Sequence, residues 1–364
     1  MMIEIDGSYL EGGGAILRVA SALAAVTGKP MKVHKIRAGR KNPGLRAQHL
    51  EGLKAVAELC SGRLVNAELG STEIEFHPGV IRPAKLEIQI STAGALGLVF
   101  QSLKVPLCLA GDEVTVNIRG GATFGKWAPP VPYTMNVLLP VLKNIGYTAE
   151  ITIKKHGFYP RGGAEVEMRG FPCLYPIEPN SFSLFSRKPF RPLHMIDRGA
   201  VGKIAGISVA SKHLRKPRVA ERQAEAAKKS LEARGLEVSV DAQYADAACA
   251  GSGVVLWATT STGAILGADS LGERGKPSEK VGEEAAMQIL QTIDSGATVD
   301  KHLSDQLLIF MALAEGQSAI TAPELTDHAR TNICVIQNFL PVEFKITDGT
   351  PTLIECSGKE RESE

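Results

Sequence analysis

The stretch "DGSYLEGGGAILRVASALAAVTGK", residues 6–29, holds three consecutive glycines followed by an apolar run that ends at another glycine. Its apolar spacing predicts an amphipathic helix over 12–28, and a glycine after the last apolar residue is typical of a helix C-cap. Residues 92–111 and 301–316 have the same character and also end at a glycine. Each of these helices is followed by a β-branched run, a second predicted helix and a closing pair of strands.

This recurrence predicts an α+β fold of three repeated βαβαββ units whose helices pack together as a shared core. The second helices are expected over 44–62, 132–146 and 327–339. Residues 186–280 lack the pattern, and a long predicted helix (218–235) followed by strands indicates a smaller inserted α/β domain. We therefore expect repeats one and two over 1–185, the insert over 186–280, repeat three over 281–345, and a C-terminal strand with a solvated tail over 346–364.

The composition is that of a globular protein, with 44% hydrophobic and 22% charged residues among 364. A net charge of +2 is too small for a general nucleic-acid coat, so a polyanion site would need local basic clusters. The six cysteines form no CxxC pair, and we expect neither zinc nor a disulfide framework. From the strand-like start we expect no signal peptide, and polar residues interrupt the longest apolar stretch. We expect a cytoplasmic protein without a membrane span.

The glycine run has two interpretations. Free N–H groups and a partial positive charge at a helix N-terminus suit an anion, but neither the P-loop nor the dinucleotide spacing follows. Arg18 favours a phosphate site, because a cation in the first turns opposes the helix dipole. Glu11 could cap the helix or hold a divalent cation. The residues alone leave open whether the run binds phosphate or only turns the chain.

A second cluster, "KIRAGRKNPGLRAQH" (35–49), gathers arginines on a loop that leads into a helix. Arginine forks suit phosphate oxygens, although a solvated loop would have the same composition. His302 and His328 each open a predicted helix of the third unit, where a structural cap residue and a ligand look alike. No histidine or cysteine spacing indicates zinc.

Six segments taken together resemble the RNA 3′-terminal phosphate cyclases: "DGSYLEGGGAILR", "IRAGRKNPGLRAQH", "STAGALGLVFQ", "HGFYPRGGAEV", "HLSDQLLIFMALA" and "HARTNI". They occur in family order over nearly the whole chain, most weakly in the insert. The resemblance implies three repeats of a unit like the C-terminal domain of a translation initiation factor, with a smaller domain between repeats two and three. Ala164 stands where the family motif has a third glycine, which leaves the local backbone open without touching a catalytic role.

The resemblance also implies an activity, the ATP-dependent conversion of an RNA 3′-phosphate into a 2′,3′-cyclic phosphate. His328 corresponds to the histidine that is adenylated with release of pyrophosphate. AMP then passes to the RNA phosphate to give RNA-3′-pp-5′-A, and the neighbouring 2′-hydroxyl displaces AMP. Nucleophilic catalysis of this kind divides one difficult transfer into easier ones.

The family motifs also imply the other site residues and partners. The residues that match the ATP-binding set are Gln101, Pro129, His302, Leu303, Ser304, Asp305 and Gln306. His302 takes a position that is tyrosine in some relatives, where it would stack on adenine opposite Pro129. The phosphate- and RNA-binding set comprises Arg18, Arg37, Arg40, Gln48 and His49, and Glu11 would lie near a divalent cation, Mg²⁺ or Mn²⁺. The expected partners are ATP and RNA with a 3′-phosphate, with no membrane and no obligate protein partner.

Two alternatives remain beside this interpretation. One branch of the family assists ribosome assembly without catalysis and lacks the nucleophilic histidine, so the presence of His328 favours the enzyme. Enolpyruvyl transferases share the larger architecture with the cyclases. The basic loop over 35–49 and the "HARTN" segment favour a cyclase over such a transferase.

Overall fold

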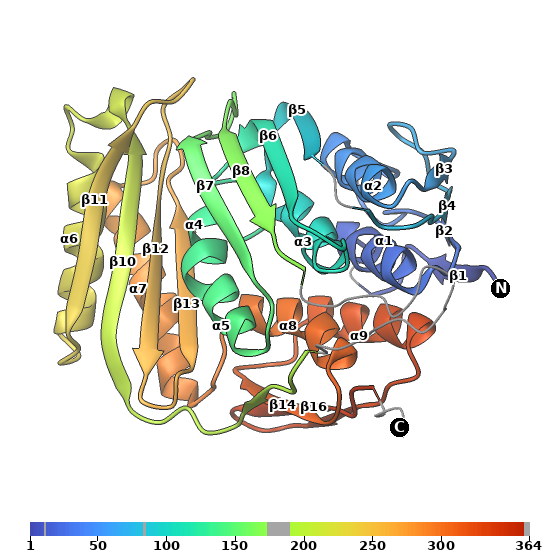
Figure 1. Ribbon diagram of the computed structural model, residues 1–364. Coiled ribbons are helices and arrows are strands. Elements are labelled where there is room, and N and C mark those ends of the chain that lie inside the picture. The colour runs from blue at the N-terminus through green and yellow to red at the C-terminus, as the bar shows by residue number, and fades with distance from the viewer. Residues whose placement is uncertain (11, 83–84, 173–189, 360–364) are drawn as a thin grey trace.

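The computed structural model describes residues 1–10, 12–82, 85–172 and 190–359. Over these residues the chain is a mixed α+β structure in which helices pack on several small mixed sheets (Figure 1). Each sheet contains one parallel strand pair and two antiparallel pairs. A parallel pair needs a crossover connection, and helical sequence separates the two strands of every such pair.

The first two sheets have the same strand pattern. The first has the order β1-β2-β4-β3 and the second β5-β6-β8-β7, with β1 parallel to β2 and β5 parallel to β6. The elements of the first are β1 Ile3–Asp6, α1 Gly14–Thr27, β2 Met31–His34, α2 Ala47–Leu59, β3 Arg63–Val65 and β4 Ile74–His77. Those of the second are β5 Lys85–Ala95, α3 Leu96–Leu107, β6 Val114–Ala122, α4 Val131–Tyr133, the π-helix η1 Thr134–Leu138, α5 Leu139–Asn144, β7 Ala149–Lys155 and β8 Glu165–Gly170.

A third sheet joins two distant parts of the chain. Its order is β15-β16-β14-β9, with β9 parallel to β14 although the two are far apart in sequence. Its elements are β9 His194–Met195, α8 Lys301–Leu313, β14 Ser318–Ala322, α9 Asp327–Phe339, β15 Phe344–Thr347 and β16 Thr352–Cys356. The intervening chain therefore leaves this unit after its first strand and returns before its first helix.

The intervening chain forms a sheet of its own, at the left of Figure 1. Its order is β11-β10-β12-β13, so the first strand of its parallel pair is internal instead of lying at the edge. The elements are β10 Val201–Ser211, the 3-10 turn η2 Lys212–Leu214, α6 Val219–Glu232, β11 Val238–Ala245, β12 Ser252–Thr260, β13 Ile265–Leu271 and α7 Ser278–Ser295. Helices α6 and α7 contact each other and this sheet, so the boundary expected at residue 280 falls inside α7.

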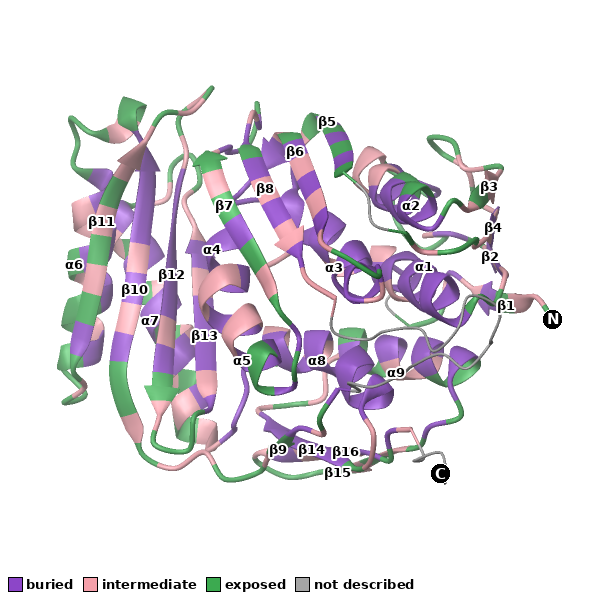
Figure 2. Ribbon diagram, viewed as in Figure 1, coloured by how far each residue is buried: buried purple, intermediate pink, exposed green. Residues whose placement is uncertain are grey.

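The helices of the other sheets form most of the core. Helix α1 contacts α2, α3 and α9, and α8 contacts α9 and η1. Figure 2 shows α1, α3 and α8 as mostly buried, whereas α6 is buried on one side only. An aromatic group beside α8 closes the packing, with the ring centroids of Tyr147 and Phe190 each 5.4 Å from that of Phe310.

The boundaries of two predicted helices need correction. The stretch predicted as helix over 92–111 begins as strand, because β5 continues to Ala95, which pairs with Ala122 of β6. Gly28 caps α1 at φ 66° as expected. Helices α3 and α8 instead end before Cys108 and Ala314, so the glycines at 111 and 316 lie beyond their caps. The helix predicted over 327–339 has those bounds.

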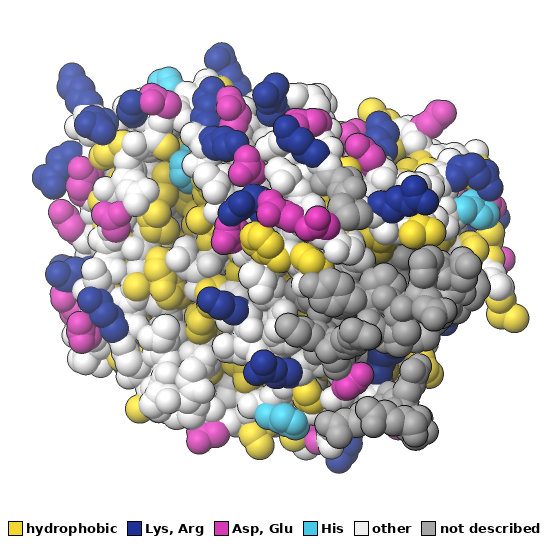
Figure 3. All heavy atoms as spheres, in the orientation of Figure 1, with side chains coloured by type: hydrophobic (Ala, Val, Ile, Leu, Met, Phe, Trp, Pro, Cys, Tyr) yellow, Lys and Arg dark blue, Asp and Glu magenta, His cyan; other side chains and the backbone are white. Residues whose placement is uncertain are grey.

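The surface and the apolar helices bear on the class of protein. Among the described residues, no helix combines the length and apolar character that crossing a bilayer requires. Figure 3 shows Lys and Arg side chains interspersed with Asp and Glu on the face in view, in keeping with the net charge of +2. No disulfide joins any of the five described cysteines, and Cys173 lies outside the described residues.

Candidate active site

The glycine run at the start of α1 packs against two side chains from the predicted phosphate set. A Cβ added at Gly14 would lie 2.3 Å from His49 Nε2 and 2.8 Å from Arg18 Nη1. Gly12 adopts a φ of 54°, which glycine tolerates without strain, and Gly13 is the N-cap with no side chain to cap the helix. The run thus turns the chain and also leaves room for an imidazole and a guanidinium at a helix N-terminus.

His49 is held as a neutral imidazole. Burial, then the charges of Arg18, Arg37 and Arg46, lower the pKa of His49 to about 3. The backbone N–H of Arg46 donates to His49 Nδ1 at 3.3 Å. A neutral ring that accepts at Nδ1 carries its proton on Nε2, and Nε2 is the atom that faces Gly14. His49 can therefore donate a hydrogen bond to an anion at this helix end.

Arg18 connects α1 to α3. Its side chain is buried, and Nε donates to Gln101 Oε1 at 2.7 Å. One turn earlier on α3, a Cβ at Gly97 would lie 2.7 Å from the carbonyl oxygen of Pro129, so the chain at Pro129 rests on the start of this helix. The structure therefore brings three predicted residues from separate motifs, Arg18, Gln101 and Pro129, to the same end of α3.

Lys104 extends this group toward α8. It lies one turn after Gln101, is buried, and its Nζ donates to the carbonyl oxygen of Gln306 at 3.1 Å. The same Nζ lies 5.4 Å from the centroid of the Phe310 ring. Burial, followed by the charge of Arg18, lowers the pKa of Lys104 to about 7, while Asp305 acts in the opposite direction. The amine thus lies beside the "HLSDQ" segment with little water around it, and it is protonated less readily than a free lysine.

Asp300, just before the "HLSDQ" segment, fixes the start of α8. Its Oδ1 accepts from the backbone N–H groups of His302 and Leu303 at 2.9 and 3.0 Å, a regular N-cap. The hydroxyl of Tyr133 donates to the same carboxylate at 2.8 Å, and the Gly267 N–H of β13 donates to Oδ2 at 2.8 Å. Asp300 therefore joins α8 to the end of α4 and to the neighbouring sheet.

His328 lies at the second position of α9, close to that segment. Thr326 is the N-cap of α9 and accepts from the Ala329 N–H, while its hydroxyl donates to Asp305 Oδ1 at 2.7 Å. Further along α9, Asn332 Nδ2 donates to the carbonyl oxygen of Asp305 at 3.1 Å. The start of α9, which carries the exposed His328, is thereby fastened to α8.

His328 acts electrostatically on His302. Burial lowers the pKa of His302, Asp300 opposes this, and the charges of Lys301 and His328 lower the pKa further. His302 is thus kept neutral more readily than a free histidine. Leu303 and Ser304 are buried on α8, and the Gln306 side chain donates back to the His302 carbonyl at 3.3 Å. These contacts fix the orientation of α8. Because Leu303 and Ser304 are buried, not every side chain of the segment is open to a ligand.

The basic loop lies beside His49. Arg37 Nη1 donates to the carbonyls of Asn42 and Gly44 at 2.9 and 3.0 Å, so this guanidinium braces its own loop. Arg40 is exposed, and the side-chain oxygen of Gln48 lies 3.2 Å from the position of a Cβ on Gly94. The charges of Arg37 and Arg46 reach His49 strongly enough to shift its pKa. The loop therefore contributes positive charge at the glycine turn.

Glu11, the residue expected beside a divalent cation, lies outside the described residues. Among the described residues, no group of three or more His, Cys, Asp and Glu side chains could hold a metal ion. The carboxylate of the "HLSDQ" segment, Asp305, already accepts from Thr326. This donor set fits a cation held chiefly by phosphate oxygens better than a site built from protein ligands alone.

Sequence reasoning missed three residues that complete the group. Lys104 counted only as one of the polar residues that interrupt the longest apolar stretch, although a lysine one turn after Gln101 in an apolar helix was a usable signal. Tyr133 and Thr326 had no signal in a single sequence, because their roles depend on hydrogen bonds to Asp300 and Asp305 from other elements.

Comparison with known proteins agrees with this arrangement of motifs. Residues 9–346 match the family model described as RNA 3′-terminal phosphate cyclase. The RNA 3′-terminal phosphate cyclase of Methanopyrus kandleri is 41% identical over 362 residues, covering 97% of this chain and 98% of that protein. The proteins of the same name from Ignicoccus hospitalis and Pyrococcus abyssi are each 42% identical, over 93% and 95% of both chains.

One solved structure, an enolpyruvyl transferase from Streptomyces tendae, matches 98% of this chain and 82% of its own at a TM-score of 0.22 and 10% identity. That similarity is too low to carry an argument about fold or activity. The family match and the relatives, by contrast, extend over nearly the full length of the sequence. The chain belongs to the RNA 3′-terminal phosphate cyclase family.

Proposed function

We propose that this protein uses ATP to convert the 3′-terminal phosphate of RNA into a 2′,3′-cyclic phosphate, with His328 as the nucleophile that carries AMP. The observation that carries the proposal is a series of neighbouring groups from the glycine turn to the start of α9. It runs from Gly14, His49 and Arg18 to Gln101, passes along α3 to Lys104 one turn later, and continues through Gln306 and Asp305 to Thr326. Anion-binding groups therefore lie in one group with the exposed histidine.

In the first step, the neutral imidazole of His328 attacks the α-phosphorus of ATP. The bond from that phosphorus to the oxygen shared with the β-phosphate breaks, and pyrophosphate leaves with the electron pair. The Arg18 guanidinium and the His49 Nε2–H stabilise the charge that develops on the phosphate oxygens. Both are held in place before ATP arrives, through Gln101 and the Arg46 backbone.

In the second step, an oxygen of the RNA 3′-phosphate attacks the adenylate phosphorus, and the phosphorus–nitrogen bond breaks. His328 recovers its lone pair, and the RNA end carries AMP through a pyrophosphate link. In the third step, the 2′-hydroxyl oxygen attacks the 3′-phosphorus, and its proton passes to water. AMP leaves with the electrons of the bridging bond, and the cyclic phosphate remains on the RNA.

Labelling with α-labelled ATP tests the nucleophile. The unmodified protein should retain labelled AMP in an acid-labile, alkali-stable bond, because a phosphoramidate has that stability. His328→Ala should retain none and should fail to cyclise RNA. His302→Ala is the matched control from the same unit, and at saturating ATP it should still be labelled, since stacking contributes only affinity.

Two outcomes would contradict the proposal. Label on His328→Ala with none on His302→Ala would mean that the wrong histidine has been assigned. An unmodified protein that binds RNA but never retains label would favour the non-catalytic, ribosome-assembly function.

Falling adenylation at acidic pH is also expected, since protonation removes the lone pair that attacks.

We further propose that Glu11 serves a divalent cation, Mg²⁺ or Mn²⁺, brought in on the phosphates of ATP. When bound, such a cation would neutralise phosphate charge next to the α1 N-terminus. Glu11→Gln keeps a polar side chain for capping but removes the charge. The expected result is a several-fold higher cation concentration for half-maximal adenylation, and an unchanged requirement would leave only a capping role.

The strand orders support a further proposal about architecture. The orders β1-β2-β4-β3, β5-β6-β8-β7 and β9-β14-β16-β15 all follow one scheme, with the parallel pair first. We infer that these sheets and their helices are three copies of one βαβαββ unit. The insert then lies within the third copy, after β9, and extends from β10 to the end of α7.

A further inference from the structure

Two exposed aromatic side chains lie on adjacent loops next to Pro129. Trp127 is 85% exposed and Tyr159 is 64% exposed. Trp127 follows β6, and Tyr159 lies between β7 and β8, the strands of the same sheet. Both loops leave the sheet at the same end of its strands, the end where β7 turns into β8 (Figure 1). Nothing in the proposed chemistry of His328 uses either ring.

The backbone holds Trp127 in an unusual conformation. Its φ is 75°, which a bulky side chain rarely adopts without a surrounding structure that imposes it. The loop is closed by a hydrogen bond from the Val131 N–H to the Thr123 carbonyl at 2.8 Å. Gly125 packs against Ala95, where a Cβ would come within 2.6 Å of the backbone. The indole is therefore presented to solvent on a short loop that is fastened on both sides.

The second loop is fastened to the first. Phe124 and Phe158 form a strand-like bridge, and their rings stack at 5.8 Å between centroids. The Thr123 N–H donates to the Gly157 carbonyl at 3.0 Å. The stacked, buried rings of Phe124 and Phe158 and this hydrogen bond thus fasten the two loops to each other.

Two basic side chains flank the exposed rings, and one of them is already paired with a carboxylate. Lys126 Nζ lies 5.8 Å from the centroid of the Tyr159 ring and 2.9 Å from Glu273 Oε1. Arg161, two residues after Tyr159, is exposed and donates weakly to the Ala248 carbonyl at 3.5 Å. Flat aromatic faces interleaved with cations are the means by which proteins hold unpaired nucleotides, through base stacking and phosphate contacts.

We propose that Trp127 and Tyr159 form a stacking platform for bases of single-stranded RNA near its 3′ end. The inference rests on the proposed function, because it supplies the route by which the RNA end reaches the site. The loop of Trp127 continues into Pro129, which packs on the first turn of α3, one turn from Gln101. Bases stacked on this platform would therefore lie beside the group that holds the terminal phosphate.

The chain offers a direct optical test, since it contains two tryptophans, Trp127 and the half-buried Trp257. The probe is a ten-nucleotide single-stranded RNA with a 3′-phosphate, titrated without ATP. Stacking on an exposed indole should quench its fluorescence, and the quench should disappear in Trp127→Phe only if Trp127 is its source. Trp257→Phe should keep the quench.

Affinity provides the second measurement. Trp127→Ala and Tyr159→Ala should each weaken RNA binding at least about fivefold, the lower end for loss of one stacked base. Trp127→Phe and Tyr159→Phe keep a ring and should recover most of that affinity. Met287→Ala, which removes a half-exposed side chain from α7, is the control for loss of surface hydrophobicity and should bind as the unmodified protein does.

Unchanged RNA affinity in both alanine variants would overturn the platform. Quenching of Trp127 by anionic phospholipid vesicles but not by RNA would also overturn it, in favour of a membrane contact. Retention of labelled AMP by the unmodified protein, which needs no RNA, is measured in parallel. Label with unaffected RNA binding rejects the platform alone, whereas absence of label rejects the proposed function.

Discussion

Cations are held in opposite ways in the two parts of this protein. On the insert, Arg222 binds both oxygens of Glu279 at 2.7 and 2.8 Å, and Arg234 Nη2 binds Asp294 Oδ1 at 2.8 Å, with all four side chains about half exposed. At the junction of α1, α3 and α8, Arg18 and Lys104 are buried and donate to amide and carbonyl oxygens.

The difference shows where charge serves stability and where it serves binding. Exposed pairs lose little solvation, contribute little and are already neutralised. Buried cations donating to neutral oxygens cost folding free energy, because amide dipoles replace water only in part. Such a cost is expected where a site waits for an anion.

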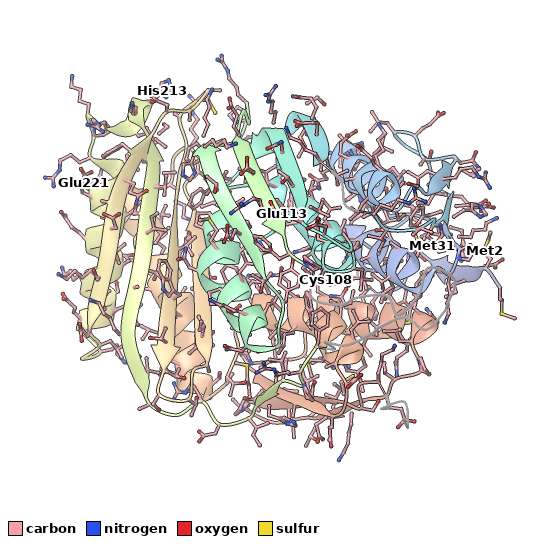
Figure 4. All side chains as sticks on the ribbon, in the orientation of Figure 1. Met2, Met31, Cys108, Glu113, His213 and Glu221 are labelled. Atoms are coloured by element: carbon pink, nitrogen blue, oxygen red, sulfur yellow. The ribbon has the colours of Figure 1, made fainter. Side chains whose placement is uncertain are left out.

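Figure 4 places His213, in the basic stretch 212–218, at the outer edge of the insert, away from this junction.

The largest expected effect comes from Lys104→Met, which should stabilise the protein at neutral and acidic pH. The pKa of Lys104 is about 7 in the folded protein against 10.5 for the free amine. Between those values the unfolded chain binds the extra proton, so the stability of the unmodified protein rises with pH. The difference should reach at most roughly 5 kcal/mol near pH 6, at about 1.4 kcal/mol per pH unit.

Urea unfolding at pH 6 and pH 9.5 measures this difference in the free energy of unfolding between the two proteins. The free energies of unfolding of the two proteins should converge as the pH rises, because the cost belongs to the charged amine. Arg18 and Asp305 are the charged neighbours that act on this amine, and both remain in the variant. A gap that is the same at both pH values would show that the introduced methionine merely packs better, and that the amine is not titrating.

Next in size is Arg18→Gln, which should weaken pyrophosphate binding roughly tenfold or more, the loss expected for a charge-assisted hydrogen bond. Pyrophosphate should raise the unfolding temperature of the unmodified protein by preferential binding to the folded state. The variant should show little shift at the same concentration, and Arg222→Gln should show the full shift. Equal shifts in all three would place the anion away from α1.

The smallest expected effect is the stability change in Arg222→Gln itself. Both Arg222 and Glu279 are about half exposed, at 42% and 46%, so solvent screens the pair. The loss should stay below about 1 kcal/mol and should shrink further at high salt concentration. A larger loss that persists in salt would mean that the insert depends on this ion pair, and the contrast between the two regions would fail.

The local structure was largely predictable from the sequence. Helix α9 was predicted with its bounds, and α1 within two residues, because apolar spacing and caps are local signals. The start of α3 was not, since the small residues over 92–95 suit either state and only the pairing of Ala95 with Ala122 makes them strand. Helix α7 was not predicted either, and its packing on β12, β13 and α6 is a long-range property of the fold.

The candidate site was likewise predictable from the sequence only in part. Motifs in one chain predicted that Arg18, Gln101, His49 and the "HLSDQ" and "HARTN" segments belong together. They could not predict that the Lys104 amine would be buried against Gln306, or that Tyr133 would reach Asp300. Those contacts join residues 202 and 167 positions apart, and no local pattern encodes such a separation.

The sequence by itself determined most of the helices and strands, the family and the set of residues from which a site can be built. These follow from short-range periodicity, capping and motif spacing, which act within one or two turns of chain. Only the tertiary structure decided the charge states and the neighbours: a neutral His49 with its proton on Nε2, a Lys104 with a pKa of about 7, and a tryptophan presented beside Pro129. Burial and long-range packing set these properties, because solvation and Coulomb interactions depend on distance in space and not on distance along the chain.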